Sequence, residues 1–195
     1  VEWEPAVDRC GTCRSCIDVC PTAAIVAPYV LDSRKCISYL TIELKGVIPR
    51  EYRKAIGNRI YGCDDCQIVC PWNSFAIKTE DEAFREREGT RQLIELMRLD
   101  DEGFRQRFRK SPIKRTKRRG LLRNVAVALG NSGNPDAVGP LTDALSDPEP
   151  LIRAHAVWAL GELLGEKALP ILDDKLTGET EEIVRTEVRH LPWGQ

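Results

Sequence analysis

Eight cysteines with a distinctive spacing are the residues of this chain best suited to chemistry. They form two runs and one isolated position: Cys10-x2-Cys13-x2-Cys16-x3-Cys20-Pro21, then Cys36, then Cys63-x2-Cys66-x3-Cys70-Pro71. The first run has the spacing that bacterial ferredoxins use for [4Fe–4S] clusters, in which the fourth cysteine ligates the other of two clusters. The sequence therefore predicts a protein that moves single electrons, alone or as part of a larger enzyme.

In this arrangement each cysteine run supplies its last cysteine to the other cluster. This rule assigns every cysteine of the chain to a cluster. Cluster one is expected to be held by the first three cysteines of the first run and the last cysteine of the second: Cys10, Cys13, Cys16 and Cys70. Cluster two then takes Cys20, Cys63 and Cys66. It lacks a fourth ligand, because Ile60 stands where a leading cysteine of the second run would be. Cys36 is the remaining thiol, so we expect it to complete cluster two.

Zinc and disulfides are the alternative uses of these cysteines. Zinc sites also contain C-x2-C pairs, but they rarely place four cysteines within eleven residues, as the first run does. Disulfides need an oxidising compartment, and no signal peptide is present. No apolar run approaches the roughly 20 residues of a membrane span. We therefore favour clusters and expect a cytoplasmic protein without a membrane partner.

The charge of the chain is divided between opposed blocks. The net charge is −1, yet residues 103–135 contain ten Lys or Arg and no acid. Residues 136–195 contain twelve acids and five bases. A block of one sign indicates a surface directed at a charged partner, here a polyanion. The alternative is a solvated face without a partner.

Composition and the positions of helix-breaking glycine and proline residues divide the chain into three segments. Residues 1–75 are predicted to be a cluster domain, residues 76–115 a charged helical linker, and residues 116–195 a helical domain. Within the cluster domain we expect a strand in residues 23–31, and a helix in residues 50–56. Ser33 is expected to cap a further helix that runs through Cys36 to Leu44.

The last segment contains an internal repeat. Ala128-Leu129-Gly130 recurs 31 residues later as Ala159-Leu160-Gly161, and Pro140 recurs 30 residues later as Pro170. A helix, a turn with glycine, a proline and a second helix form the unit of a HEAT-type α-solenoid. Such repeats either offer a concave surface to a partner or cap the cluster domain. The predicted fold class is therefore α+β: a ferredoxin-like domain with two [4Fe–4S] clusters, followed by all-α HEAT-like repeats.

Longer motifs around the cysteines resemble those of the epoxyqueuosine reductases. They include Tyr29-Val30-Leu31-Asp32, Cys36-Ile37-Ser38-Tyr39-Leu40-Thr41-Ile42-Glu43-Leu44-Lys45-Gly46, Tyr61-Gly62-Cys63-Asp64-Asp65-Cys66-Gln67 and Arg119-Gly120-Leu121-Leu122-Arg123-Asn124. The resemblance implies an oxidoreductase of queuosine biosynthesis, which reduces epoxyqueuosine in a tRNA anticodon with cobalamin and two [4Fe–4S] clusters. It also implies an external electron donor, and we expect a monomer.

Candidate binding residues follow from this resemblance and from the basic block. Ser38, Lys45 and Asp64 lie in the family-like segments and are candidates to contact the corrinoid. Each of the three has an alternative role in local hydrogen bonding or as a surface charge. The candidates for tRNA phosphates are six cations at the start of the repeats: Lys114, Arg115, Lys117, Arg118, Arg119 and Arg123.

Members of the resembled family carry a further domain before the first cysteine run. That domain holds most of the corrinoid pocket and the acidic residue expected to donate a proton. This chain begins nine residues before Cys10 and does not start with Met. We therefore expect it to be the C-terminal part of such an enzyme, with no catalytic residue of its own and no independent turnover.

Two other functions remain possible on the sequence alone. One is a stand-alone ferredoxin-type electron carrier, and the other is a corrinoid enzyme like the reductive dehalogenases, which would act on small molecules. The basic block argues against both, because neither has a use for ten clustered cations. His155 is expected to be a packing residue of a helix and not a ligand.

Overall fold

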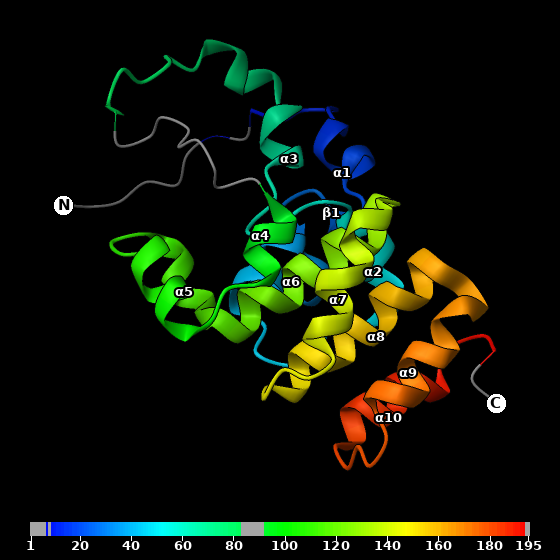
Figure 1. The fold of residues 1–195 in the computed structure, drawn as a ribbon. Coiled ribbons are helices and arrows are strands. Elements are labelled where there is room, and N and C mark those ends of the chain that lie inside the picture. Colours follow the sequence, from blue (N-terminus) through cyan, green and yellow to red (C-terminus); the bar gives the residue numbers. More distant parts are fainter. Residues whose placement is uncertain (1–6, 8, 83–91, 194–195) are drawn as a thin grey trace.

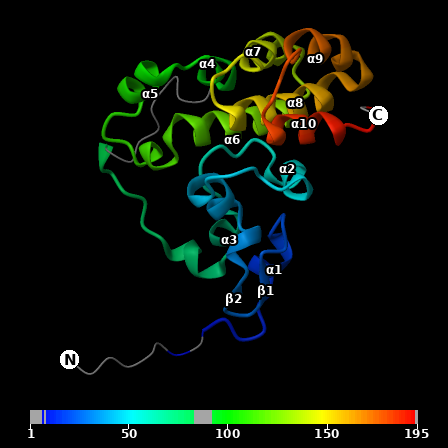
Figure 2. The same cartoon turned by 90° about the horizontal axis from the view of Figure 1, so that it is seen from below.

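The computed structural model describes residue 7, residues 9–82 and residues 92–193. A small cysteine-bearing module lies at one end of the molecule, and longer helices pack together at the other (Figures 1 and 2). The symbol η denotes a 3-10 helix or, for η2, a π-helix. The elements in chain order are α1 (Ser15–Val19), β1 (Ile25–Ala27), β2 (Val30–Leu31), η1 (Ser33–Lys35), η2 (Tyr39–Glu43), α2 (Arg50–Ile56), α3 (Asp65–Ile68), η3 (Pro71–Phe75), α4 (Leu93–Met97), α5 (Asp101–Arg107), η5 (Pro112–Thr116), α6 (Lys117–Ser132), η6 (Pro135–Ala137), α7 (Val138–Ala144), α8 (Pro150–Leu164), η7 (Gly165–Ala168), α9 (Leu169–Lys175) and α10 (Glu182–Arg189).

The two cysteine runs fold into two short helices that pack against each other. α1 contains Cys16, α3 contains Cys66, and the two helices lie side by side (Figure 1). Each run then becomes extended at the cysteine that precedes a proline, with ψ 114° at Cys20 and ψ 121° at Cys70. The residue before a proline is disfavoured in the helical region, so the sequence itself keeps either helix from continuing through this cysteine.

The segment between the runs differs from the single capped helix that we expected. Asp32, not Ser33, is the cap, because its Oδ1 accepts a hydrogen bond from the backbone N–H of Arg34 at 3.1 Å. The short turn η1 ends at Cys36, whose backbone is extended (φ −66°, ψ 124°). A π-helical turn, η2, follows. The prediction of one helix through Cys36 was wrong, because the chain breaks at the cysteine itself.

Two other local predictions for the module are confirmed. The predicted strand in residues 23–31 is present as the antiparallel hairpin of β1 and β2. The predicted helix over residues 50–56 is α2, with the same bounds.

The predicted helical repeats are confirmed, and their recurring glycine has a packing reason. α6 and α8 form the central pair, with α7 and α9 as their following helices. A Cβ added at Gly130 of α6 would lie 2.9 Å from the Cα of Ala159 in α8. A side chain at this position would therefore force the two central helices apart, which explains why the repeat unit carries a glycine there.

Gly130→Ala is expected to destabilise the chain by about 1–3 kcal/mol, the usual cost of overpacking a rigid contact. Gly46→Ala is the control, because Gly46 is exposed and nothing stands within 4 Å of its added Cβ. That control should be close to neutral, because the new methyl group meets no neighbour. Urea unfolding of the two variants measures the difference, and equal midpoints would contradict the close approach of α6 and α8.

Residues 92–116 pack on the repeats. α4 lies against α6 and α7, and its Leu96 and Met97 are buried. Phe104 and Phe108 are also buried, with ring centroids 5.2 Å apart. The segment predicted as a charged linker is thus helical and part of the core.

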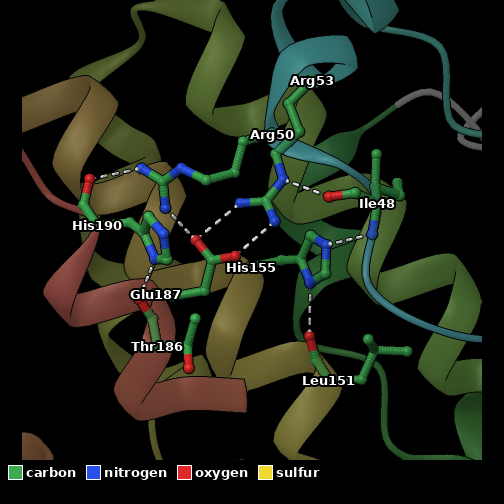
Figure 3. A network of polar contacts seen from close by, with 8 residues as sticks. All are labelled: Ile48, Arg50, Arg53, Leu151, His155, Thr186, Glu187 and His190. Atoms are coloured by element: carbon green, nitrogen blue, oxygen red, sulfur yellow. Dashed lines mark hydrogen bonds and ion pairs between the residues drawn. The ribbon is translucent and has the colours of Figure 1, made fainter. Parts of the chain in front are cut away.

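A buried ion-pair network joins the cysteine module to the repeats (Figure 3). Glu187 of α10 accepts hydrogen bonds from both terminal nitrogens of Arg53 in α2, at 3.0 and 2.6 Å, and also pairs with Arg50. Arg53 Nε donates to the carbonyl of Ile48 at 2.8 Å. The backbone N–H of Ile48 donates in turn to Nε2 of His155 in α8, at 3.2 Å. The module and the repeats are therefore locked together by polar contacts with defined geometry.

His155 is a structural residue, as expected. Its ring is fully buried, and its Nδ1 lies 2.8 Å from the carbonyl oxygen of Leu151. Burial, together with the nearby charge of Arg53, lowers the pKa of His155 well below its usual value. The neutral ring therefore carries its proton on Nδ1 and accepts at Nε2.

One continuous hydrophobic core runs across the predicted segment boundaries. It includes Ile37, Leu40 and Ile56 of the module together with Leu121 and Ile152 of the repeats. The domain boundaries at residues 75 and 115 therefore remain a prediction. None of the helices that the structure describes is both long and apolar enough to cross a membrane.

Candidate functional site

Two neighbouring cavities are lined by the eight cysteines. The smaller one, of about 280 Å³, is lined by the cysteines assigned to cluster one: Cys10, Cys13, Cys16 and Cys70. Trp72 and Phe75 form an aromatic wall of this cavity. The indole N–H of Trp72 donates to the carbonyl of Arg9 at 3.2 Å and so ties the end of the second run to the start of the first. The last cysteine of one run is thereby brought to the first three of the other.

The larger cavity, of about 430 Å³, is lined by all four cysteines assigned to cluster two: Cys20, Cys36, Cys63 and Cys66. Cys10, Cys13 and Cys16 border it as well. Its other walls are mostly apolar and come from the hairpin and its neighbours, including Ile25, Leu31 and Ile37. The isolated Cys36 therefore lies with the second run, as the ligand count requires.

The thiols of the larger cavity influence one another electrostatically. Burial, followed by the charges of Cys63, Cys36 and Cys20, raises the pKa of Cys66. Burial is also the main cause that raises the pKa of Cys63. Thiolates gathered this closely repel each other unless a cationic centre lies between them. The four groups thus have the donor type and the proximity that a cubane requires.

Hydrogen bonds to sulfur are already present in the first run. The backbone N–H of Ala24 donates to Sγ of Cys20 at 3.3 Å. Burial alone would raise the pKa of Cys20, but this bond and those from Thr22 outweigh it and lower the pKa. A hydrogen bond from Ser15 lowers the pKa of Cys13. Such bonds stabilise thiolates and are among the factors that set the potential of a cluster.

The cavities favour clusters among the possible uses of these cysteines. All eight are free thiols, and each assigned set of four surrounds a cavity. This arrangement suits a cluster whose irons each take one thiolate better than a single zinc ion, whose four ligands meet at one point.

The three candidates for the corrinoid lie apart from these cavities. The Ser38 hydroxyl accepts a hydrogen bond from the Cys63 backbone N–H at 3.0 Å and lies 3.2 Å from the Cys63 carbonyl oxygen. Lys45 Nζ donates to the carbonyls of Ile42 and Arg115, each at 3.4 Å, and the Asp64 carboxylate accepts from Gln67 at 2.7 Å. Ser38 thus supports a cysteine loop, and the corrinoid contacts of all three residues stay predictions.

The basic block divides into exposed and structural cations. Lys114, Arg115 and Lys117 are exposed at the start of the repeats, and Arg119 is half-buried. Arg115 forms an ion pair with Glu43, with Nε and Oε1 2.7 Å apart. The net positive charge of the block is therefore smaller in the fold than in the sequence, because an acid from the cysteine module neutralises part of it.

Two of the six cations predicted to contact tRNA are used inside the protein. Arg123 is fully buried and donates to the backbone carbonyls of Leu40, Leu44 and Gly46, so its assignment to phosphate binding was wrong. Arg118 Nε donates to the carbonyl of Leu99 at 2.7 Å, and its terminal nitrogens pair with Asp147. Neither guanidinium is free to bind a phosphate.

Burial and the repulsion from Arg119 lower the pKa of Arg123 to about 10, so this guanidinium is still charged at neutral pH. The charge is spread over backbone carbonyls and the side chain of Asn124.

Asn124 and Thr41 are structural partners of the cysteine loops that were not predicted from the sequence. Asn124 Nδ2 donates to the carbonyls of Thr41 and Ile60, and the Thr41 hydroxyl accepts from the N–H of Gly62. The sequence feature that could have revealed them is the polar pair Arg123-Asn124 within an apolar stretch. Adjacent polar residues flanked by Leu and Val indicate a buried pair with a partner to satisfy.

Comparisons with known protein families divide the chain into the same two parts, a cysteine module and helical repeats. Residues 9–73 match the family described as 4Fe-4S double cluster binding domain, and residues 115–191 match the HEAT repeats. These matches confirm the predicted fold class of a two-cluster domain followed by HEAT-like repeats.

Curated relatives and solved structures are epoxyqueuosine reductases. The protein of that name from Xanthomonas campestris is 49% identical over 161 residues, covering 81% of this chain and 45% of the relative. The one from Escherichia coli is 40% identical over 191 residues, covering 97% of this chain and 50% of the relative.

Among solved structures, an epoxyqueuosine reductase crystallised with an epoxyqueuosine-modified tRNA-Tyr stem loop has a TM-score of 0.86 at 34% identity. That match covers 94% of this chain and 49% of the other. The enzyme from Streptococcus thermophilus has a TM-score of 0.81 at 30% identity, over 96% of this chain and 50% of the other. The chain spans about half the length of the relatives it matches, and over that stretch it belongs to the epoxyqueuosine reductase family.

Proposed function

We propose that this chain carries the electron-transfer clusters and the tRNA-contacting repeats of an enzyme that reduces epoxyqueuosine to queuosine in a tRNA anticodon. The observation that carries the proposal is the pairing of two cavities with two complete sets of four cysteines. The family match gives this pairing its context, because the relatives are named for that reaction.

The clusters supply the reducing equivalents of the reaction. Conversion of an epoxide to an alkene takes two electrons and two protons and releases the oxygen as water. A [4Fe–4S] cluster passes one electron at a time. In the proposal, Cys10, Cys13, Cys16 and Cys70 hold one cluster, and Cys20, Cys36, Cys63 and Cys66 hold the other. Cys10, Cys13 and Cys16 border both cavities, so the two clusters lie next to each other and form a path for electrons.

Cobalamin is proposed as the second cofactor because of the family resemblance. Ser38, Lys45 and Asp64 line neither cysteine cavity, and their polar groups are hydrogen-bonded within the chain. These three residues therefore give no corrinoid pocket of their own. We propose that most of the corrinoid contacts and the proton donor come from a further domain, so this chain by itself would not turn over substrate.

Iron content tests the proposal and separates it from zinc binding. The full chain, reconstituted without oxygen, is expected to take up about eight irons and eight sulfides, since two cubanes contain that number. About four irons, or tightly held zinc in their place, would contradict the ligand count.

Binding of tRNA separates the proposal from an electron carrier and from a small-molecule enzyme. Of the six candidate cations, four remain available for phosphates once the two used inside the protein are removed: Lys114, Arg115, Lys117 and Arg119. Lys45 lies beside them, because its Nζ reaches the carbonyl of Arg115. Four phosphate contacts predict that log K for an epoxyqueuosine-containing stem loop falls with log salt at a slope of about −3 to −4.

Reversal of two exposed cations tests where the nucleic acid lies. Lys114→Glu together with Lys117→Glu is expected to weaken binding and to reduce the magnitude of the salt slope by about 2. Lys167→Glu together with Lys175→Glu changes the net charge equally, but on the exposed surface of the acidic repeats. This control should weaken binding much less. Equal losses in both variants, or binding that ignores salt, would favour one of the two alternative functions.

A further inference from the structure

Arg123 is a buried cation that reaches from the repeats into the cysteine module. All five N–H donors of its guanidinium are used. Three go to backbone carbonyls around η2, those of Leu40 (2.8 Å), Leu44 (2.8 Å) and Gly46 (2.7 Å). The other two go to Oδ1 of Asn124, at 3.0 and 2.8 Å. Burying a charge is costly, so these bonds must hold the backbone around η2 firmly in place to offset it.

Asn124 connects the two segments that carry the scattered cysteines. Its Nδ2 donates to the carbonyl of Thr41, in the segment that follows Cys36, at 2.7 Å. The same Nδ2 donates to the carbonyl of Ile60, three residues before Cys63, at 2.8 Å. Because Oδ1 of Asn124 accepts from Arg123, the orientation of the amide is fixed. One side chain of α6 therefore sets the distance between the Cys36 segment and the Cys63 segment.

A second layer of hydrogen bonds carries this constraint to the cysteine itself. The Thr41 hydroxyl accepts from the N–H of Gly62 at 2.9 Å, and the Ser38 hydroxyl accepts from the N–H of Cys63 at 3.0 Å. On the other side, the carbonyl of Cys36 accepts from the N–H of Leu40 at 2.9 Å. Cys36 is thus bonded to Leu40, whose carbonyl Arg123 holds, and Cys63 is bonded to the side chain of Ser38 in the same segment.

We propose that Asn124 and Arg123 are positioning residues for the cluster held by Cys20, Cys36, Cys63 and Cys66. The inference rests on the proposed ligand assignment of that cluster. Cys36 and Cys63 come from segments far apart in the chain, so their spacing depends on contacts from outside both. The first repeat helix supplies those contacts, and this gives the repeats a role in electron transfer in addition to tRNA binding.

The potential of a cluster depends on hydrogen bonds near its sulfurs and on exposure to solvent, so a shift of the Cys63 loop changes it. The other cluster is held by cysteines that Asn124 and Arg123 do not contact. A positioning role therefore predicts a selective effect on one of the two clusters.

The test compares Asn124→Asp with Asn131→Asp in the full chain. Asn131 lies on the same helix, and its Nδ2 also bridges two carbonyls of the cysteine module, those of Arg53 and Gly57. Both substitutions remove an equivalent pair of donors and add the same charge. Only the first touches the segments of Cys36 and Cys63. The readout is anaerobic iron content and a redox titration of each cluster by electron paramagnetic resonance.

Asn124→Asp is expected to change the reduced-to-oxidised ratio of its cluster about tenfold at a fixed potential, a shift of about 59 mV for a one-electron couple, or to abolish that cluster. The signal of the cluster at Cys70 should stay as in the wild type, and Asn131→Asp should alter neither cluster. Thr41→Val leaves α6 intact and removes the hydroxyl that accepts from the N–H of Gly62 and donates to the carbonyl of Ile37. It should shift the same cluster in the same way, and it decides the question if Asn124→Asp does not fold.

Equal shifts in Asn124→Asp and Asn131→Asp would overturn the positioning role, as would unchanged titrations in Asn124→Asp and Thr41→Val. If the wild type holds two cubanes in those cases, the proposed function still stands. A wild type that takes up fewer than two cubanes overturns both.

Discussion

Replacement of Cys36 by alanine is expected to remove one complete cluster, about four of eight irons, and to leave the other intact. Cys36 lies in neither cysteine run, yet it lines the larger cavity with Cys20, Cys63 and Cys66. The second run offers no cysteine in its place, because Ile60 stands where a ferredoxin-like run would have one. Iron and sulfide analysis after anaerobic reconstitution, with electron paramagnetic resonance of the reduced protein, measures the loss.

Cys70→Ala provides the reciprocal experiment. Cys70 belongs to the second run in sequence but lines the smaller cavity with Cys10, Cys13 and Cys16. Its loss should impair the cluster of the first run and spare the one at Cys36. If Cys36→Ala retained two unaltered cubanes, or if both variants lost the same signal, the crossed assignment of ligands would be wrong.

The sequence was most informative where local rules determine the structure. The X-Pro rule keeps the cysteine helices from continuing through Cys20 and Cys70, and the spacing within each run limits where the thiols can lie. The recurrence of Ala-Leu-Gly after 31 residues is also visible without any tertiary contact, although the close approach of α6 and α8 that explains Gly130 is seen only in the fold. The fold class and the ligand count could therefore be predicted from local spacing and repetition.

Predictions about individual polar side chains depended on contacts far apart in the chain. Arg118 and Arg123 lie in a block without acids, and the sequence suggested a surface for phosphates. In the fold, Arg118 meets Asp147 and Arg123 meets the carbonyls around η2. Neither partner can be read from the block itself. The start of a HEAT-like helix can face solvent or a neighbouring domain, and only the tertiary packing decides which.

The prediction for Ser38 shows the same limit. Its position in a family-like segment suggested contact with a cofactor, but its hydroxyl is bonded to the backbone of Cys63. Conserved-looking motifs around a cofactor contain residues that hold the ligands as well as residues that touch the cofactor. The spacing of residues cannot distinguish the two roles.

Glu187→Gln is expected to destabilise the protein by about 3–5 kcal/mol, the range found when one partner of a buried ion pair is removed. Glu187 is 4% exposed and Arg53 is 0% exposed, so the loss leaves a guanidinium without its counterion in the core. Arg50 loses the same partner. The Arg53 guanidinium also lies 5.5 Å from the ring of Trp158, which cannot replace a carboxylate. Urea unfolding of the cluster-loaded chain under anaerobic conditions measures the change.

Glu162→Gln is the matched control for this effect. Glu162 pairs with Lys54 of α2 and so also joins the module to the repeats, but the two side chains are 29% and 63% exposed. Exposed pairs contribute about 0–1 kcal/mol, because water screens them and ordering long side chains costs entropy. Hydrogen exchange should show that Glu187→Gln loosens α2 and α10 together, since this carboxylate bridges them, whereas Glu162→Gln leaves both protected. If the two variants unfolded at the same urea concentration, burial of the Glu187 network would not be what holds the cysteine module to the repeats.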